Sequence, residues 1–255
     1  MIVYKLIAIA TLLLTACSAD PPRDKTARAR ARGADVSAEW RSYLGADMNH
    51  FSPLTQIDAG NVDRLEVAWT YDAGGASDSG SSQMQVNPLV VDGVLFGISP
   101  TLRLFALDAA TGEELWSFEP DVTGRPWTSS RGVSYWEEGN ERRLFFGATS
   151  RLYAIDPRTG HALEDFGDGG FVDLEDGLGR EVDDMMGVVL TTPGTIFEDL
   201  LIVGGRVNEL AGAAPGHVRA FDVRTGEQRW IFHTCLLYTS PSPRDVEESR
   251  MPSSA

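Results

Sequence analysis

Three segments of the chain repeat one phrase, and this repetition constrains the fold more than any other feature of the sequence. Each segment runs from alternating apolar residues into Asp-x-x-Thr-Gly, and the copies span residues 104–112, 152–160 and 218–226. The alternation is typical of a half-buried strand. Asp, Thr and Gly favour a tight turn because short polar side chains bond the local backbone and glycine permits positive φ. Each phrase therefore predicts a strand, a turn and the start of a returning strand, within a repeat architecture.

A second hairpin is predicted upstream of each phrase. In the first unit Asp92-Gly93 separates the apolar runs 88–91 and 94–97, which is a strong hairpin-turn signal. Comparable hairpins are predicted within residues 131–147 and 193–205. A unit of four antiparallel strands, repeated along the chain, is typical of a β-propeller blade. The sequence thus predicts an all-β fold, a β-propeller of four-stranded antiparallel blades, of which this chain holds about three.

Aromatic residues recur at fixed distances behind the turns. They are Trp116 and Trp230, four residues past the glycine, and Phe118, Phe166 and Phe232, six residues past it. These side chains are expected to pack between neighbouring units. The second copy has Glu164 in place of the Trp, so a weaker contact with the next unit is predicted there.

The strand order separates a scaffold end from a site end. The turns between the first two strands and between the last two strands of each unit lie at one end, and the other loops lie at the opposite end. Every Asp-x-x-Thr-Gly turn falls at the first end, so Asp108, Asp156 and Asp222 are interpreted as structural rather than catalytic.

Polar residues of different units fall at the opposite end. Gln85, Arg131 and Thr192 precede or begin the first strands of the three units, Thr149 ends a second strand, and residues 206–216 form a long loop. Amide, guanidinium, hydroxyl and carboxylate groups from separate blades would converge at one mouth of the propeller. The sequence therefore predicts a small-molecule site there.

The two ends of the chain are interpreted separately from the fold. Residues 1–17 have Lys5 before an apolar run and end in Leu-Thr-Ala-Cys17, which resembles the lipobox of a bacterial lipoprotein signal peptide. Cys17 would carry the lipid, and residues 18–37 would form a flexible tether. An ordinary secretory peptide with an incidental cysteine is the alternative. Residues 235–255 resemble a translated sequencing adapter and are excluded from the predicted propeller of residues 38–234.

Composition limits the partners. The formal net charge of -15 argues against nucleic acid as a partner. The chain has two cysteines, Cys17 and Cys235, so it offers no disulfide framework for an oxidising compartment. His217, like His50 and His161, is interpreted as a surface or turn residue.

From Trp40 to Thr234 the ordered succession of motifs resembles the dehydrogenases that use pyrroloquinoline quinone (PQQ), and within them the glucose-dehydrogenase-like branch. The motifs are Trp40-Arg-Ser-Tyr, Phe51-Ser-Pro-Leu-Thr-Gln-Ile, Leu65-Glu-Val-Ala-Trp and the three blades that follow. The resemblance implies a sugar or alcohol substrate and PQQ as hydride acceptor. It also implies that electrons pass to a membrane quinone. The absence of adjacent cysteines shortly before Arg131 favours the sugar-oxidising side.

The resemblance also implies roles for individual residues. PQQ carries three carboxylates, which the planar fork of an arginine matches better than a lysine does. Arg131, in Arg-Gly-Val-Ser-Tyr, matches the family's cofactor-binding arginine, with Gln85, Thr149 and Thr192 as further cofactor ligands. The alternative for Arg131 is a salt bridge at a blade edge.

Family members also hold Ca²⁺ against the quinone as a Lewis acid. Glu209 matches a family metal ligand across a short gap, and a solvated loop acid is its alternative. The resemblance also implies an incomplete ring, about three of eight blades, with the catalytic base in the later blades. The chain alone is therefore predicted to be inactive.

The resemblance and the lipobox together predict a lipid-anchored protein of the periplasm, at the outer membrane of a Gram-negative bacterium. A different class shares the lipobox and the repeated turns. It is the propeller scaffold lipoprotein of the outer-membrane β-barrel assembly machinery, which binds no cofactor. The combination of Gln85, Arg131 and Thr149 with long loops favours the dehydrogenase.

Overall fold

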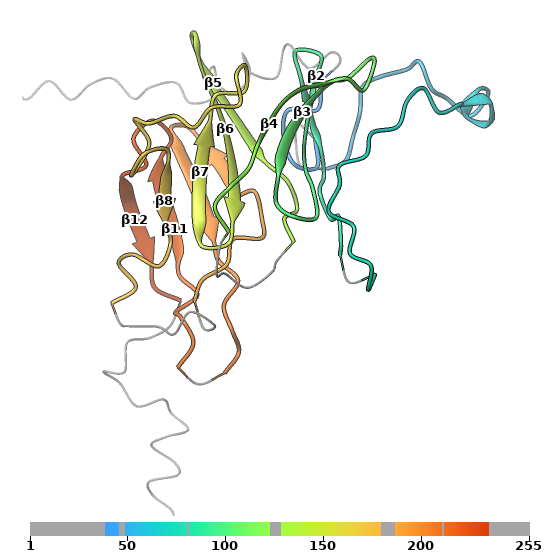
Figure 1. The fold of residues 1–255 in the computed structure, drawn as a ribbon. Helices are drawn as coiled ribbons and strands as arrows, with labels where there is room; N and C mark the ends of the chain where they lie inside the picture. The colour runs from blue at the N-terminus through green and yellow to red at the C-terminus, as the bar shows by residue number, and fades with distance from the viewer. Residues whose placement is uncertain are drawn as a thin grey trace, which may run out of the picture. The chain divides into compact units, whose positions relative to one another are not determined.

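A computed structural model describes residues 39–45, 49–80, 82–122, 129–179, 187–210 and 212–234 (Figure 1). The predicted signal peptide with Cys17, the tether and the tail lie outside these ranges. Within them, no helix has the length and apolar character to cross a membrane.

The described chain forms three four-stranded antiparallel sheets, which confirms the predicted all-β propeller blades. The first sheet holds β1 (Leu89–Val91), β2 (Val94–Ile98), β3 (Leu104–Asp108) and β4 (Glu114–Phe118). The second holds β5 (Ser134–Glu138), β6 (Glu141–Ala148), β7 (Arg151–Ile155) and β8 (Phe171–Asp173). The third holds β9 (Thr195–Phe197), β10 (Leu200–Gly204), β11 (Val218–Asp222) and β12 (Gln228–Phe232). The strands of each sheet pair in chain order, and the one described helix is the short 3₁₀ helix η1 (Val62–Arg64).

The turns form as their residues predict. Asp92 and Gly93 both have positive φ, 50° and 76°, as the tight turn between β1 and β2 requires. In the first Asp-x-x-Thr-Gly turn, Oδ1 of Asp108 accepts hydrogen bonds from the backbone N–H groups of Ala110 and Thr111. The N–H of Gly112 donates to the Asp108 carbonyl. The aspartate thus closes the turn that joins β3 to β4, which is a structural role.

Hydrogen bonds lower the pKa of all three turn aspartates. Backbone and hydroxyl hydrogen bonds from Thr111 hold the pKa of Asp108 below its usual value, and the hydrogen bond from Arg158 does so for Asp156. Burial acts to raise the pKa of Asp222, but hydrogen bonds from Arg229 and the backbone outweigh it and the pKa is lowered.

Stability is therefore expected to fall in acid. A carboxyl whose folded pKa is depressed stabilises the fold above its unfolded pKa, about 3.9, and that contribution disappears as the pH falls through the folded pKa. In urea denaturation measured between pH 6 and 3, the urea concentration at the unfolding midpoint should fall once the pH is below about 4. Asp222→Asn keeps a side-chain oxygen that accepts the hydrogen bonds of the turn but removes one titrating carboxyl. The urea midpoint of this variant should therefore depend less on pH. An unchanged pH dependence would contradict the stabilising role assigned to the Asp222 carboxylate.

The second sheet departs from the predicted returning strand. After the turn at Gly160 the backbone makes an isolated bridge between Ile155 and Ala162, and the fourth strand, β8, begins only at Phe171. Residues 163–170 form a loop inserted between this bridge and the strand. The insertion moves Phe166 into the core, where it is fully buried against Phe145 at a ring-centroid distance of 5.5 Å.

Strand β6 carries the core on both of its faces. Leu144, Phe146 and Ala148 belong to a cluster with the first sheet, whereas Phe145 belongs to a cluster with the third sheet. Successive strand residues point to opposite faces, so one buried strand can serve two neighbours. All of these side chains are fully buried. The second sheet is therefore packed between the other two.

Two of the predicted aromatic contacts, those of Trp116 and Phe118, join neighbouring sheets, whereas Trp230 and Phe232 are exposed. Trp116 of β4 lies over Gly160 in the next unit, and its Nε1 donates to the carbonyl of Pro157 at 3.0 Å. Phe118 packs against Tyr153 of β7 with ring centroids 5.5 Å apart. The same arrangement occurs one unit earlier, where Trp69 lies over Gly112 and donates to the carbonyl of Ala109 at 3.2 Å.

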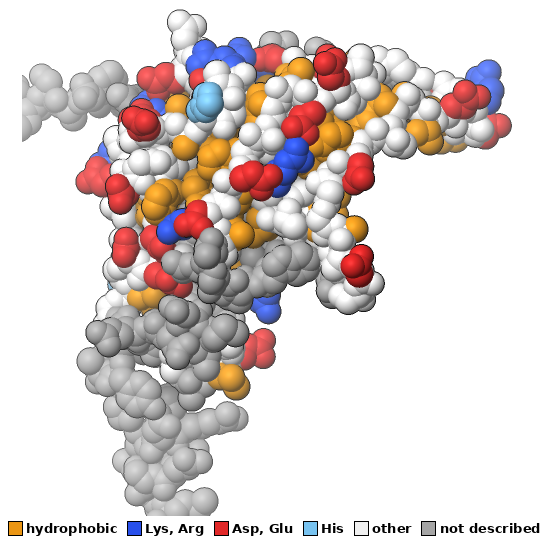
Figure 2. All heavy atoms as spheres, in the orientation of Figure 1, with side chains coloured by type: hydrophobic (Ala, Val, Ile, Leu, Met, Phe, Trp, Pro, Cys, Tyr) orange, Lys and Arg blue, Asp and Glu red, His pale blue; other side chains and the backbone are white. Residues whose placement is uncertain are grey.

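Between the second and third sheets, backbone groups make the contact that a Trp makes in the two preceding cases. Where Glu164 stands, the inserted loop instead brings the N–H of Gly167 to the carbonyl of Thr225 at 2.9 Å. A Cβ on Gly226 would lie 2.8 Å from the Gly167 nitrogen. The Trp-free junction is thus closed by a direct hydrogen bond between turns. Figure 2 shows hydrophobic side chains reaching the surface among charged ones. The exposed large hydrophobic residues of the described chain include Leu65, Val67, Leu115 and Phe232.

Candidate functional site

The first strands of the three sheets begin side by side. The N–H of Asn87 donates to the carbonyl of Arg131, and the N–H of Arg131 donates to the carbonyl of Thr191, both at 2.9 Å. These residues lie just before β1, β5 and β9. We call this end of the sheets the site end, and the end with the Asp-x-x-Thr-Gly turns the turn end. Residues separated by more than 40 positions thus meet in one hydrogen-bonded row.

A glycine allows this close approach. Gly132 has φ of 145° and forms a parallel bridge with Asn87. A Cβ at Gly132 would lie 2.9 Å from the Asn87 carbonyl oxygen. Any larger residue at this position would push apart the segments that lead into β1 and β5, and would displace the neighbouring Arg131.

Gln85 and Arg131 present exposed polar groups at the site end. Gln85 is exposed, and its Oε1 accepts a hydrogen bond from Oγ of Ser129 at 3.1 Å. Arg131 is also exposed, and its guanidinium forms no ion pair with any residue in the described ranges. By contrast, Arg142 and Arg143 each have a carboxylate partner. Within the described chain, the guanidinium of Arg131 remains available to an anionic ligand.

The two threonines differ in accessibility. Thr149 is buried, its hydroxyl donates to the carbonyl of Ala148 at 2.6 Å, and its own carbonyl accepts from Leu190 at 2.8 Å. Its φ of 57° is unusual for a β-branched residue. Thr192 is exposed directly after the hydrogen-bonded row. Thr149 therefore fixes the backbone beside the row, and Thr192 offers its hydroxyl to solvent.

Glu209 lies exposed in the loop between β10 and β11, and the neighbouring Asn208 accepts a hydrogen bond from Leu210 within that loop. In the described part of the chain no group of three His, Cys, Asp or Glu side chains is placed to hold a metal ion. The Ca²⁺ ligand role of Glu209 stays a prediction.

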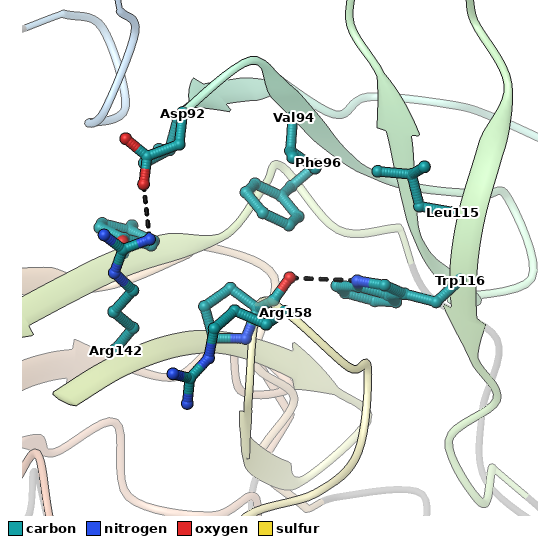
Figure 3. Close-up of a pocket in the computed structure, with 10 residues that line it drawn as sticks. Asp92, Val94, Phe96, Leu115, Trp116, Arg142 and Arg158 are labelled. Carbon is teal, nitrogen blue, oxygen red and sulfur yellow. Dashed lines mark hydrogen bonds and ion pairs between the residues drawn. The ribbon is translucent and has the colours of Figure 1, made fainter. Parts of the chain in front are cut away.

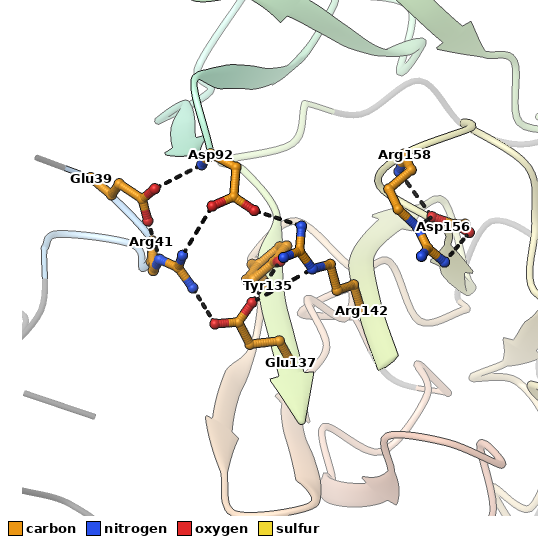
Figure 4. A network of polar contacts seen from close by, with 8 residues as sticks. All are labelled: Glu39, Arg41, Asp92, Tyr135, Glu137, Arg142, Asp156 and Arg158. Carbon is orange, nitrogen blue, oxygen red and sulfur yellow. Dashed lines mark hydrogen bonds and ion pairs between the residues drawn. The ribbon is translucent and has the colours of Figure 1, made fainter. Parts of the chain in front are cut away.

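The turn end carries a network of charges instead of a site (Figure 4). Arg41 pairs with Glu39, Asp92 and Glu137, and Arg142 pairs with Asp92 at 2.5 Å. The backbone of Trp40 pairs with Val90 of β1. Burial and the charge of Glu137 raise the pKa of Tyr135, which donates to that carboxylate. The network fastens the segment before the sheets to the first two units.

A pocket of about 100 Å³ opens beside this network (Figure 3). Phe96, Trp116 and Pro157 form its apolar part, and Arg142 and Arg158 lie at its edge. Because Asp92 and Pro157 belong to turns at the turn end, the pocket lies away from Gln85 and Arg131. It is the gap left beside the Trp116 contact and is not the predicted cofactor site.

The prediction for His217 is wrong. This histidine is 7% exposed, and its Nε2 lies 3.2 Å from Nδ1 of His233. The sequence signal that was missed is its position: His217 directly precedes one strand and His233 directly follows its partner strand. Ser129, the partner of Gln85, was also missed, because the segment before Arg131 has no strand periodicity.

Comparison with known proteins identifies the class. Residues 40–254 match the PQQ family model described as the β-propeller domain of glucose, ethanol and alcohol dehydrogenases. The quinohemoprotein alcohol dehydrogenase of Comamonas testosteroni superposes with a TM-score of 0.65 at 24% identity, over 83% of this chain and 29% of that chain. That likeness concerns the fold alone. The chain belongs to the family of PQQ-dependent dehydrogenases, which favours that prediction over the scaffold lipoprotein.

Curated relatives act on different substrates. The chain is 31% identical to quinate/shikimate dehydrogenase (quinone) of Acinetobacter baylyi, over 78% of this chain and 28% of that protein. It is 32% identical to quinoprotein glucose dehydrogenase of Escherichia coli, over 76% of this chain and 27% of that protein. The chain thus spans less than a third of the length of these relatives.

Proposed function

We propose that the chain is part of a periplasmic quinoprotein dehydrogenase that oxidises a sugar or an alcohol and passes the electrons to a membrane quinone. Family membership supports the oxidoreductase class. The proposal is carried by the position and the accessibility of Arg131. Its exposed guanidinium has no ion-pair partner in the described ranges, and its backbone joins the row formed with Asn87 and Thr191.

The donors at the site end suit PQQ. The fork of Arg131 can hold a carboxylate through two parallel N–H groups, Gln85 offers an amide, and Thr192 offers a hydroxyl. Thr149 keeps the backbone row in place through its buried carbonyl. When bound, PQQ supplies the acceptor for the hydride that leaves the substrate carbon as its C–OH becomes C=O. The residues of this chain bind and orient the cofactor, and the proton goes to a base outside the described ranges.

Three further features belong to the proposal. Glu209 contributes one oxygen ligand to Ca²⁺, which needs several more. Cys17 carries the lipid that anchors the protein to the outer membrane. The sugar side of the family is favoured, because Arg131 is not preceded by adjacent cysteines.

The test uses the complete protein from which the chain derives. Reduction of an artificial dye should require both PQQ and a sugar or alcohol. Arg131→Ala should raise the PQQ concentration for half-maximal activity about 10- to 150-fold, since hydrogen bonds to charged groups contribute roughly 1.5–3 kcal/mol. Fluorescence titration with PQQ should show the same change without turnover.

Arg158→Ala is the matched control. Arg158 lies at the turn end, where its side chain is 60% exposed and paired with Asp156, so PQQ binding should be unchanged. Equal PQQ affinity in Arg131→Ala and in the unaltered protein would overturn the proposal that Arg131 binds PQQ. Dye reduction that does not depend on PQQ would overturn the function.

A further inference from the structure

Two histidines meet across neighbouring strands at the site end of the third sheet. Val218 of β11 pairs in register with Phe232 of β12, so His217 and His233 form the next cross-strand pair. Nε2 of His217 lies 3.2 Å from Nδ1 of His233. The ring centroids are 4.5 Å apart, with the ring planes at 88°. Both rings therefore direct a nitrogen towards the same small volume.

The backbone around the pair is held in place. The N–H of His217 donates to the carbonyl of Pro215 at 2.9 Å, and the hydroxyl of Thr234 donates to the carbonyl of Gly216 at 2.7 Å. His217 is 7% exposed, whereas His233 is exposed to solvent. One ring is thus fixed by its surroundings and the other can turn. Because the His217 ring is already fixed, the entropic cost of binding a ligand between the two rings is lowered.

The spacing suits a metal ion. A tetrahedral ion with Zn–N bonds of about 2.0–2.1 Å separates its nitrogen ligands by about 3.3–3.4 Å, close to the 3.2 Å between these two nitrogens. Imidazole is a preferred ligand of Zn²⁺ and Cu²⁺. The formal net charge of -15 also favours a cation near the protein.

We propose that His217 and His233 form a two-histidine site for a divalent transition-metal ion such as Zn²⁺ or Cu²⁺. A turn of the exposed His233 ring replaces the nitrogen contact by two metal bonds. The proposal assigns the remaining coordination positions to water. The ion clamps the end of β12 to the start of β11. This site is separate from the predicted Ca²⁺ site, because Ca²⁺ takes oxygen ligands.

Zn²⁺ titration of the untagged 255-residue chain tests the proposal. Cys17 and Cys235 are replaced by serine in every version, so that thiolates cannot bind the metal. Calorimetry should show one saturable site that also raises the melting temperature, because an ion that binds only the folded state stabilises it. His233→Gln should abolish both effects. It alters the exposed partner, so loss of folding is not the expected reason.

Two further measurements make the outcome decisive. His161→Gln, which alters an exposed histidine in a turn, should bind Zn²⁺ as the parent chain does. Electron paramagnetic resonance of bound Cu²⁺ should show coupling to two imidazole nitrogens in the parent chain and to at most one in His233→Gln. Absence of a saturable site, unchanged binding in His233→Gln, or a single coupled nitrogen in the parent chain would overturn the proposal.

Discussion

Replacing Gly160 by alanine is expected to lower the free energy of unfolding by about 2–5 kcal/mol. Two costs add. The φ of 75° at Gly160 lies in the left-handed region, which is unfavourable for residues with a side chain. The new Cβ would also lie 2.6 Å from Cε3 of Trp116, so the indole must leave its place over the turn. Urea denaturation followed by tryptophan fluorescence measures the loss.

Gly139→Ala is the control for this prediction. Its φ of 60° is similar, but a Cβ there meets no atom within 4 Å. Only the backbone cost of about 1–2 kcal/mol should remain. If the two variants lose equal stability, then the contact between Trp116 and Gly160 does not join the first two sheets as described.

Phe145→Ala is expected to cost about 3–5 kcal/mol, the usual range for removing a buried phenylalanine. Phe145 is fully buried on β6 and packs against Phe166 from the inserted loop. Its cluster includes Leu201 and Phe221 of the third sheet. The cavity would therefore weaken the second sheet and its junction with the third. Denaturant unfolding gives the size of the loss.

Phe197→Ala makes the same chemical change at an exposed position. Phe197 of β9 is 54% exposed, so its removal should alter stability by no more than about 0.5 kcal/mol. A large loss at Phe197, or a small one at Phe145, would show that the core does not lie between the second and third sheets.

The repeated phrases made most of the sheet architecture predictable. The alternation in residues 104–112 and the Asp92-Gly93 turn are local signals, and both correspond to strands and turns at the predicted places. The late start of β8 was not predictable in this way. The repeated phrase predicts a returning strand directly after the turn, in conflict with the loop signal of Gly167, Gly169 and Gly170. The contact of this loop with the distant Thr225 has no local sequence signal.

The candidate site was predictable only as a set of residues. Sequence order placed Gln85, Arg131 and Thr192 at one end of the sheets. In the structure, backbone hydrogen bonds among Asn87, Arg131 and Thr191 bring the segments that carry these residues together. The inward orientation of the Thr149 hydroxyl was not predictable, because it follows from a positive φ at a residue type that rarely adopts one.

The Trp contacts have a consequence for how the protein is made. Trp69 bonds a carbonyl 40 residues ahead of it, and Trp116 bonds one 41 residues ahead. Each of these Trp contacts can therefore form once the next 40 or so residues have left the ribosome, before more distant parts of the chain are made. Successive units can thus pack against one another in order during vectorial synthesis.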